Sequence, residues 1–149
     1  ALTAYQKGER KHPSMRGIAA SLTDQDMADL GAYYEAHGQV AGAAAPGKAM
    51  EAGGRAAELV KKGACVSCHG DNFSKPIDPT YPKIAGQHKD YLFVALKSYK
   101  ADKGALVGRS NGIMAGIAGQ FSNAELKELA TYVASLPSDL KTVPQRKFR

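Results

Sequence analysis

Long apolar runs and large apolar side chains are scarce in this sequence of 149 residues. No run approaches the roughly 20 apolar residues that a membrane-spanning helix needs, so we expect no transmembrane segment. The N-terminus lacks a basic stretch followed by an apolar one, and we therefore expect a mature or trimmed soluble protein without its targeting signal. Hydrophobic residues still make up 44% of the chain, which suffices for a packed core. Much of that fraction is alanine, so a bound group that fills the interior would compensate for the small side chains.

Cysteine is nearly absent as well. The two cysteines, Cys65 and Cys68, are too few for a disulfide scaffold and too close together for a long-range disulfide.

Acidic side chains are outnumbered by basic ones, and the formal charge is +6. Residues 41–149 carry sixteen Lys and Arg against nine Asp and Glu, whereas residues 1–40 carry four against five. Such a basic segment is typical of proteins that bind nucleic acid, an anionic membrane or an acidic protein.

The alternation typical of strands is missing, and three segments have the period of a helix. Residues 89–102 carry an apolar stripe at helical spacing. Residues 123–136 follow Ser122 as N-cap, and Glu125 completes a capping box. A third helix is expected over residues 54–66, directly before the cysteines. The sequence therefore predicts an all-α fold.

An internal repeat organises the chain. Residues 1–34 align with residues 95–133 across one short gap, so that Ala-Leu-x-x-Tyr recurs and Met15 falls opposite Met114. Composition alone does not produce a shared helix–loop–helix of this length. We therefore expect four segments: a partial domain at 1–37, a Gly/Ala/Pro linker at 38–52, a complete domain at 53–136 and a basic tail at 137–149.

Residues 65–69 read Cys-Val-Ser-Cys-His, the C-x-x-C-H signature of covalent haem attachment. Two thiols at this spacing can add to the two vinyl groups on one edge of a porphyrin, and His69 can then reach the iron as an axial ligand. A thioredoxin-like dithiol would need a βαβ context, and zinc would need two more ligands at a finger-like spacing. A pair of buried cysteines without chemistry is the remaining alternative. We expect one haem c with its iron, bound through Cys65 and Cys68.

An electron carrier with six-coordinate iron needs a second axial ligand, and Met114 is the best candidate. It lies in Gly112-Ile113-Met114-Ala115-Gly116, which we expect to be a loop, whereas a methionine that only fills a core usually lies on an amphipathic helix. Met50 in the linker and His88 at a helix start are the alternative ligands. A thioether ligand favours reduced iron and raises the reduction potential.

The haem motif and the candidate ligand Met114 make the second part of the chain resemble a class I cytochrome c. The two-part repeat resembles the dihaem cytochrome c4 group. The similarity covers residues 53–136, with residues 1–37 as the later half of a first domain. It rests on the stretches Cys65 to Gly70, Pro82 to Gln87 and Tyr91-Leu92, on Met114, and on a closing helix with Tyr132. It implies the class I helical fold around a covalent haem, preceded by a helical half-domain of the same kind. It also implies that the Pro82 carbonyl accepts a hydrogen bond from the proximal imidazole; a simple turn proline is the alternative.

The sequence departs from the dihaem pattern because it holds one C-x-x-C-H motif instead of two. Met15 occupies the ligand position of a partial domain that has neither cysteines nor a proximal histidine. Three explanations stay open: a missing N-terminal segment of a longer chain completes this domain, a second chain does so, or the partial domain is a vestige packed as structure.

The resemblance implies a single-electron carrier of the bacterial periplasm, soluble or membrane-associated, between a respiratory donor and a terminal oxidase or reductase. The alternative is a cytochrome electron-entry subunit or module of a larger dehydrogenase complex. We expect no catalytic residue, because a haem enzyme or gas sensor needs an open iron site. No histidine or arginine is obviously placed as the acid or base of such an enzyme, and His88 and Arg109 are left open for that role.

The basic side chains between the haem motif and Met114 are expected to surround the exposed haem edge and to meet an acidic docking patch on a redox protein partner. Six of the basic side chains in this interval carry the expectation: Lys83, Lys89, Lys97, Lys100, Lys103 and Arg109. Ordinary solvated lysine is the simpler alternative. Nucleic acid is not expected, because no base-reading element or stacking platform accompanies the charge.

Overall fold

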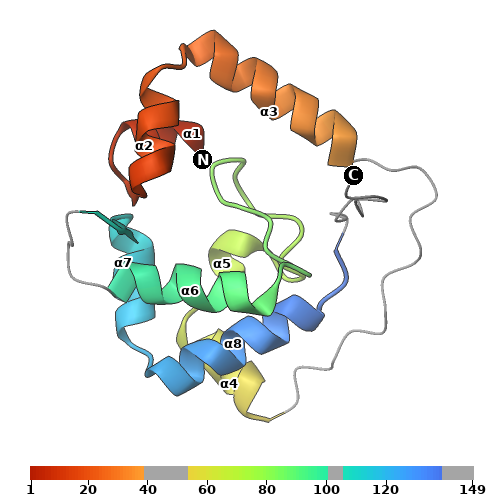
Figure 1. Cartoon of the computed structure of the whole chain (residues 1–149). Helices are drawn as coiled ribbons and strands as arrows, with labels where there is room; N and C mark the ends of the chain where they lie inside the picture. The colour runs from red at the N-terminus through yellow and green to blue at the C-terminus, as the bar shows by residue number, and fades with distance from the viewer. Residues whose placement is uncertain (39–53, 101–105, 139–149) are drawn as a thin grey trace, which may run out of the picture.

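The structure is a computed structural model that describes residues 1–38, 54–100 and 106–138. Most of the expected linker and basic tail, with Met50 and Lys103, lies outside these residues. Helices dominate the described chain, as Figure 1 shows, and the all-α prediction is confirmed.

The N-terminal unit, defined here as residues 1–38, contains three helices and one short strand. These are α1 (Leu2–Gln6), β1 (Arg10–Lys11), α2 (Pro13–Ala20) and α3 (Asp24–Gly38). Helix α1 packs against α2 and α3. The three helices lie together at one end of the molecule (Figure 1).

The C-terminal unit, defined here as residues 54–138, contains the other elements. These are α4 (Arg55–Lys62), α5 (Val66–His69), α6 (Lys89–Lys100), β2 (Gly108–Arg109), α7 (Gly112–Gly119) and α8 (Asn123–Ser135). Helix α8 packs against α6 and α4, and α6 also packs against α7. Helix α8 therefore joins α4, from the start of the unit, to α6 in its middle.

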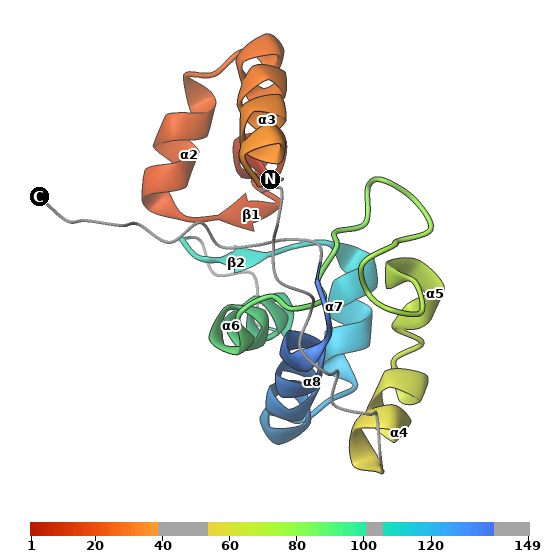
Figure 2. The same ribbon diagram turned by 90° about the vertical axis from the view of Figure 1, so that its right-hand side faces the viewer.

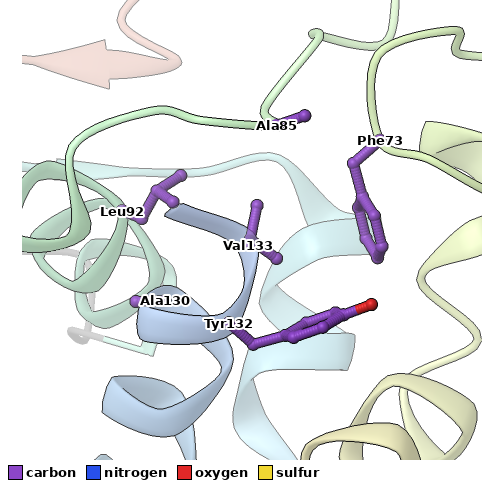
Figure 3. Close-up of a cluster of buried hydrophobic side chains, with 6 residues drawn as sticks. All are labelled: Phe73, Ala85, Leu92, Ala130, Tyr132 and Val133. Carbon is purple, nitrogen blue, oxygen red and sulfur yellow. The ribbon is translucent and has the colours of Figure 1, made fainter. Parts of the chain in front are cut away.

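Helix α8 supplies most of the hydrophobic core. Its buried face carries Leu126, Leu129, Ala130, Tyr132 and Val133. Figure 3 shows Tyr132 and Val133 beside residues from other segments, Phe73, Ala85 and Leu92. The rings of Phe73 and Tyr132 meet edge to face with centroids 6.4 Å apart, a favourable aromatic geometry. A second cluster joins Leu59 of α4 and Phe121 to the same helix.

The capping box that the sequence predicts at the start of α8 is present. The Ser122 hydroxyl accepts a hydrogen bond from the Glu125 backbone N–H at 3.2 Å, and the Glu125 carboxylate accepts one from the Ser122 N–H at 2.7 Å. These two bonds satisfy backbone donors that a helix start leaves without partners.

After the gap in the repeat, the N-terminal unit repeats elements of the C-terminal unit at a constant offset. Helices α2 and α7 each have eight residues and begin 99 positions apart, and α3 and α8 also begin 99 positions apart. Thr23 and Asp26 exchange the same reciprocal hydrogen bonds before α3 that Ser122 and Glu125 exchange before α8. Strands β1 and β2 pair antiparallel and join the two units (Figure 2).

Three helix boundaries differ from the prediction. The expected helix over 54–66 is divided into α4 and α5, because Ala64 adopts a left-handed conformation with φ 47° that interrupts the helix. The helix expected over 89–102 is described as far as Lys100, and residues 101–105 lie outside the described part. The helix expected over 123–136 ends at Ser135, ahead of Pro137.

The prediction of a loop around Met114 was wrong, because Met114 lies within helix α7. Each glycine in a helix costs about 0.5–1 kcal/mol relative to alanine, which favours a loop. Two contacts oppose that cost. The side chain of Asn111 caps the helix by accepting a hydrogen bond from the Met114 N–H at 3.0 Å, and α7 packs against α6.

Candidate functional site

Helix α5 brings Cys65, Cys68 and His69 together in one turn. Cys65 is the N-cap residue, and its carbonyl accepts hydrogen bonds from the N–H groups of Cys68 and His69 at 3.4 and 3.1 Å. Both thiols are free and half-buried. Residues three apart lie on the same face of a helical turn, so the two sulfur atoms can serve one ligand edge.

The thiol of Cys65 lies in an apolar environment. Burial raises the pKa of Cys65 and outweighs a backbone hydrogen bond that acts in the opposite direction. The thiol is therefore neutral at pH 7. Reactive C-x-x-C dithiols depend instead on a lowered thiol pKa, so this environment does not favour thioredoxin-like chemistry.

The imidazole of His69 is held by a backbone carbonyl. Its Nδ1 lies 2.9 Å from the carbonyl oxygen of Pro82, and the residue is buried. A carbonyl can only accept, so Nδ1 carries the hydrogen and donates it. The other ring nitrogen, Nε2, then keeps its lone pair for a metal ion, which is the arrangement that orients histidine ligands in metalloproteins.

The segment between α5 and α6 folds back to place Pro82 beside His69. Gly70 starts it with φ +78°, and Phe73 also adopts a left-handed conformation with φ 58°. The Phe73 carbonyl accepts hydrogen bonds from the N–H groups of Ile84 and Ala85 at 2.9 and 3.1 Å. These bonds hold the chain just after Pro82 and close the loop that contains it.

The two methionines of the repeat lie on equivalent helices. Met114 is half-buried in α7, and Met15 is half-buried in α2. Within the described residues, no hydrogen bond joins the sulfur of Met114 to the group formed by the cysteines, His69 and Pro82. His88 is exposed at the residue before α6, where its carbonyl accepts a hydrogen bond from the Leu92 N–H.

The basic side chains on α6 have different surroundings. Lys97 is exposed and its ammonium lies 5.4 Å from the centroid of the Phe93 ring. Lys100 donates a hydrogen bond to the carbonyl of Phe121 and so ties α6 to the turn before α8. Lys83 and Lys89 are exposed.

One cluster was missed by the sequence analysis. The hydroxyl of Tyr91 accepts hydrogen bonds from Arg10 at 2.8 Å and from Arg109 at 3.0 Å, and Arg109 also donates to Tyr99 at 3.4 Å. Burial acts to raise the pKa of Tyr91, but the bonds and charges of the two arginines outweigh it and lower that pKa. The repeat held a signal for this cluster, since Arg10 and Arg109 lie at the shared offset of 99.

The described residues hold neither a further metal site nor a membrane-spanning helix. No group of three or more His, Cys, Asp or Glu side chains among them is placed to hold a metal ion. None of their helices is both long enough and apolar enough to cross a membrane.

Residues 54–137, more than half of the chain, match the sequence model of the cytochrome c family. The chain belongs to the cytochrome c family. Its cofactor is therefore haem c with iron, attached through Cys65 and Cys68 of the C-x-x-C-H motif. The structure fits this group, since two free thiols and an imidazole with Nε2 available lie within one turn of α5. Cytochromes c are electron-transfer proteins and not enzymes.

The comparisons extend the likeness beyond the family match to most of the chain. Cytochrome c4 from Azotobacter vinelandii is 32% identical over 132 residues, which cover 85% of this chain and 61% of that protein. The thiosulfate dehydrogenase electron acceptor from Stutzerimonas stutzeri is 32% identical and covers 91% of this chain and 64% of its own length. The chain thus spans less than two thirds of these curated relatives.

Two solved structures resemble the chain as a whole. The structure of cytochrome c4 from Acidithiobacillus ferrooxidans superposes with a TM-score of 0.64 over 91% of this chain and 80% of that chain. Its identity is 22%, so this likeness shows the fold alone. The structure of thiosulfate dehydrogenase from Marichromatium purpuratum has a TM-score of 0.66 and 33% identity, over 91% of this chain and 30% of that chain.

Proposed function

We propose that this cytochrome c is a single-electron carrier with His69 and Met114 as the axial ligands of its haem iron. It moves electrons between a respiratory donor and a terminal oxidase or reductase in the bacterial periplasm. The observation that carries the proposal is the 2.9 Å contact between His69 Nδ1 and the Pro82 carbonyl. This contact leaves Nε2 for the iron and restrains the rotation of the ring.

The chain's own residues have distinct tasks in this proposal. Haem iron, when bound, alternates between two oxidation states and so supplies one-electron transfer. Cys65 and Cys68 would hold the porphyrin through thioether bonds, His69 would bind its iron through Nε2, and the Pro82 carbonyl keeps the Nδ1 proton in place. The thioether of Met114 would be the second iron ligand, which would exclude exogenous ligands and favour the reduced state.

Substitution of Met114 tests the ligand assignment. The Met114→Ala variant should keep covalent haem but have a reduction potential lower by on the order of 100 mV, a fraction of the ~0.8 V that axial ligands span. It should also bind added imidazole or carbon monoxide. Spectroelectrochemistry and ligand titration measure both effects. Ile113→Ala, at the exposed neighbouring position of α7, is the matched control. An unchanged potential in Met114→Ala would remove Met114 from the ligand role.

The N-terminal unit extends the proposal to a second domain of the same kind. Residues on α8 are buried where their equivalents on α3 are exposed: Leu129 is 5% exposed against 36% for Leu30, and Tyr132 is 9% exposed against 55% for Tyr33. In the C-terminal unit, α4 and α6 cover this face. Residues 1–37 are thus the later half of a cytochrome domain, and a further segment of the same polypeptide covers α3 and adds a haem whose ligand is Met15.

Haem counting tests this second domain. The mass of the complete gene product from its native host, set against its haem content, should give two haems per polypeptide. One haem per complete polypeptide would contradict the second domain and leave the single-haem carrier in place. A second polypeptide that co-purifies and carries the missing haem would assign the covering segment to a partner.

A second candidate function is an electron-entry module of a dehydrogenase complex. The likeness to a thiosulfate dehydrogenase electron acceptor and to the structure of a thiosulfate dehydrogenase favours it. Stopped-flow mixing of the oxidised cytochrome with a thiosulfate dehydrogenase and thiosulfate separates the two functions. Rapid reduction supports the module, whereas reduction only by a quinol-oxidising complex supports the general carrier.

A further inference from the structure

Gly63 lies between helices α4 and α5, two residues before the attachment residue Cys65. It is the C-cap of α4, with φ −83° and ψ −1°. Its φ is negative, so the left-handed backbone that requires glycine at other positions is absent here. What distinguishes this glycine is the space around its α-carbon.

A side chain at residue 63 would collide with two neighbours. A β-carbon built on Gly63 would lie 3.0 Å from the Sγ atom of Cys65, and 3.1 and 3.2 Å from the Cζ and Cε2 atoms of Phe121. Atoms in favourable contact are about 3.5–4.0 Å apart, so an alanine here would crowd both groups. The sulfur and the ring edge thus both lie on the side of Gly63 where a side chain would be.

Phe121 is held in place from several directions. The residue is 2% exposed and belongs to the second core cluster. The ammonium of Lys62 lies 4.7 Å from the centroid of its ring, and Lys100 donates a hydrogen bond to its carbonyl. In a closely packed core, such a ring has little freedom to move away from a new methyl group. The Cys65 sulfur, which is half-buried, is therefore the neighbour that an alanine at residue 63 would displace.

The position of this sulfur matters for the attachment of haem. When a thiol adds to a vinyl group, the S–H bond and the π bond of the vinyl group break. The sulfur bonds to the vinyl carbon next to the porphyrin ring, and the hydrogen goes to the terminal carbon, so no oxidant or reductant is consumed. Such a reaction between two held groups depends steeply on their alignment. A displaced Cys65 sulfur would therefore react poorly, even where Cys68 in the same turn still reacts.

We propose that Gly63 is a positioning residue for haem attachment, because its lack of a side chain lets the Cys65 sulfur take the position from which its thioether bond forms. Phe121 is the fixed neighbour that makes a larger residue unfavourable at this position. The inference goes beyond the proposed function, since it concerns attachment at Cys65 and holds whichever residue is the second axial ligand.

Mapping of the two cysteines tests the inference. The variant Gly63→Ala is produced with haem in a host that attaches haem c, then denatured and treated with iodoacetamide, which alkylates only free thiols. Mass spectrometry should find neither cysteine alkylated in the wild type. Part of the haem-bearing Gly63→Ala chains should have lost the Cys65 thioether bond and carry the alkyl group there, with Cys68 still bound to haem. Gly17→Ala is the control and should match the wild type, because open space surrounds Gly17.

A compensating substitution separates this steric effect from a general loss of stability. Leucine is shorter than phenylalanine and leaves room where the Cζ atom of Phe121 lies. The double variant Gly63→Ala with Phe121→Leu should therefore regain the Cys65 thioether bond. Its melting temperature should nevertheless stay below that of the wild type, because a smaller core side chain leaves a cavity. A merely structural role of Gly63 would not restore attachment while stability stays low.

The other outcomes are equally clear. Complete attachment at both cysteines in Gly63→Ala would overturn the inference. Equal loss at Cys65 and Cys68 would also overturn it, because it would indicate a general defect of folding. If Gly63→Ala yields no stable protein, the double variant decides. Recovery of haem-bearing protein in the double variant would support the steric role, and continued failure would contradict it.

Discussion

At Gly70 the backbone has a φ of +78°, and a β-carbon built there would overlap the carbonyl oxygen of Lys75. Left-handed backbone of this kind suits glycine, because the residue has no side chain to clash. The turn that begins here carries the chain to Pro82, whose carbonyl holds His69. The orientation of the proximal imidazole therefore depends on a residue twelve positions before Pro82.

Gly70→Ala should destabilise the haem-loaded protein by more than about 1 kcal/mol, since it combines an unfavourable φ with a backbone clash. Denaturant unfolding followed by haem absorbance measures this loss. Gly17→Ala is the control: Gly17 lies inside α2 with open space around its α-carbon, so alanine there should raise stability by about 0.5–1 kcal/mol. Equal effects at the two positions would show that the turn tolerates a side chain.

Single residues were predictable where the chemistry is local. The C-x-x-C-H motif, with its attachment cysteines, is visible in five consecutive letters, and its haem c is confirmed by the family. The axial ligands His69 and Met114 stay predictions. The contact of Arg10 with Tyr91 joins residues 81 positions apart, and no local sequence pattern predicts it. The left-handed conformation of Phe73 likewise has no sequence signal, because its tertiary hydrogen bonds to residues 84 and 85 impose it.

Helix starts are the elements that this sequence specifies most clearly. The capping boxes before α3 and α8 have the same hydrogen-bond geometry. The first is formed by Thr23 and Asp26, and the second by Ser122 and Glu125. Hydrogen bonds from the N–H and hydroxyl of Ser122 lower the pKa of Glu125, and the charges of Lys62 and Arg55 add to the effect. The ionised carboxylate therefore stabilises the folded chain more than the protonated one does.

The depressed pKa fixes the direction of a pH effect. Its contribution to the free energy of unfolding is fully present above the ordinary glutamate value of 4.5 and is lost as the pH falls from there through the lower folded pKa. The stability difference between wild type and Glu125→Ala should therefore shrink below about pH 4.5. Thermal unfolding across a pH series measures this difference. Glu128→Ala, which removes a carboxylate of the same helix that does not cap it, is the matched control.

Whole elements were predicted where apolar periodicity and a cap coincide, as for α8. The split between α4 and α5 was not visible, because Ala64 carries no sign of a left-handed backbone. Helix α7 was predicted to be a loop because its three glycines have a low helix propensity. The helix forms because a cap and a contact with α6 stabilise it, and only the folded chain supplies that contact.

The molecule as a whole is basic, with a net charge of +6 before the haem is counted. If its redox partner presents an acidic patch, these charges steer the encounter and set its rate more than its final affinity. Helix α6 is the element to test, because Lys97 is exposed there. Lys100 is a poorer choice, since its ammonium holds the Phe121 carbonyl and a substitution would disturb the fold.

Lys97→Glu should slow association with a physiological partner several-fold at low salt and much less at high salt, because the Debye length falls from about 30 Å at 0.01 M to about 10 Å at 0.1 M. Stopped-flow rates over an ionic-strength series provide the measurement. Lys127→Glu on α8 reverses the same charge at another exposed position. Equal slowing in both variants would mean that net charge alone governs the rate, and a salt-independent wild-type rate would indicate apolar docking.

The strand pair that joins the two units also has a kinetic consequence. Arg10 and Arg109 are 99 positions apart in the chain, so their pairing must close a long loop, and the entropy cost of closure grows with about (3/2)RT ln n. Contacts within the C-terminal unit close somewhat shorter loops, such as the hydrogen bond between Lys62 and Gln120 at a separation of 58 positions, so their closure costs somewhat less entropy. The N-terminal unit leaves the ribosome before the C-terminal unit does, yet its docking waits until β2 has formed. Docking of the N-terminal unit is therefore a late step of folding, although that unit comes first in the chain.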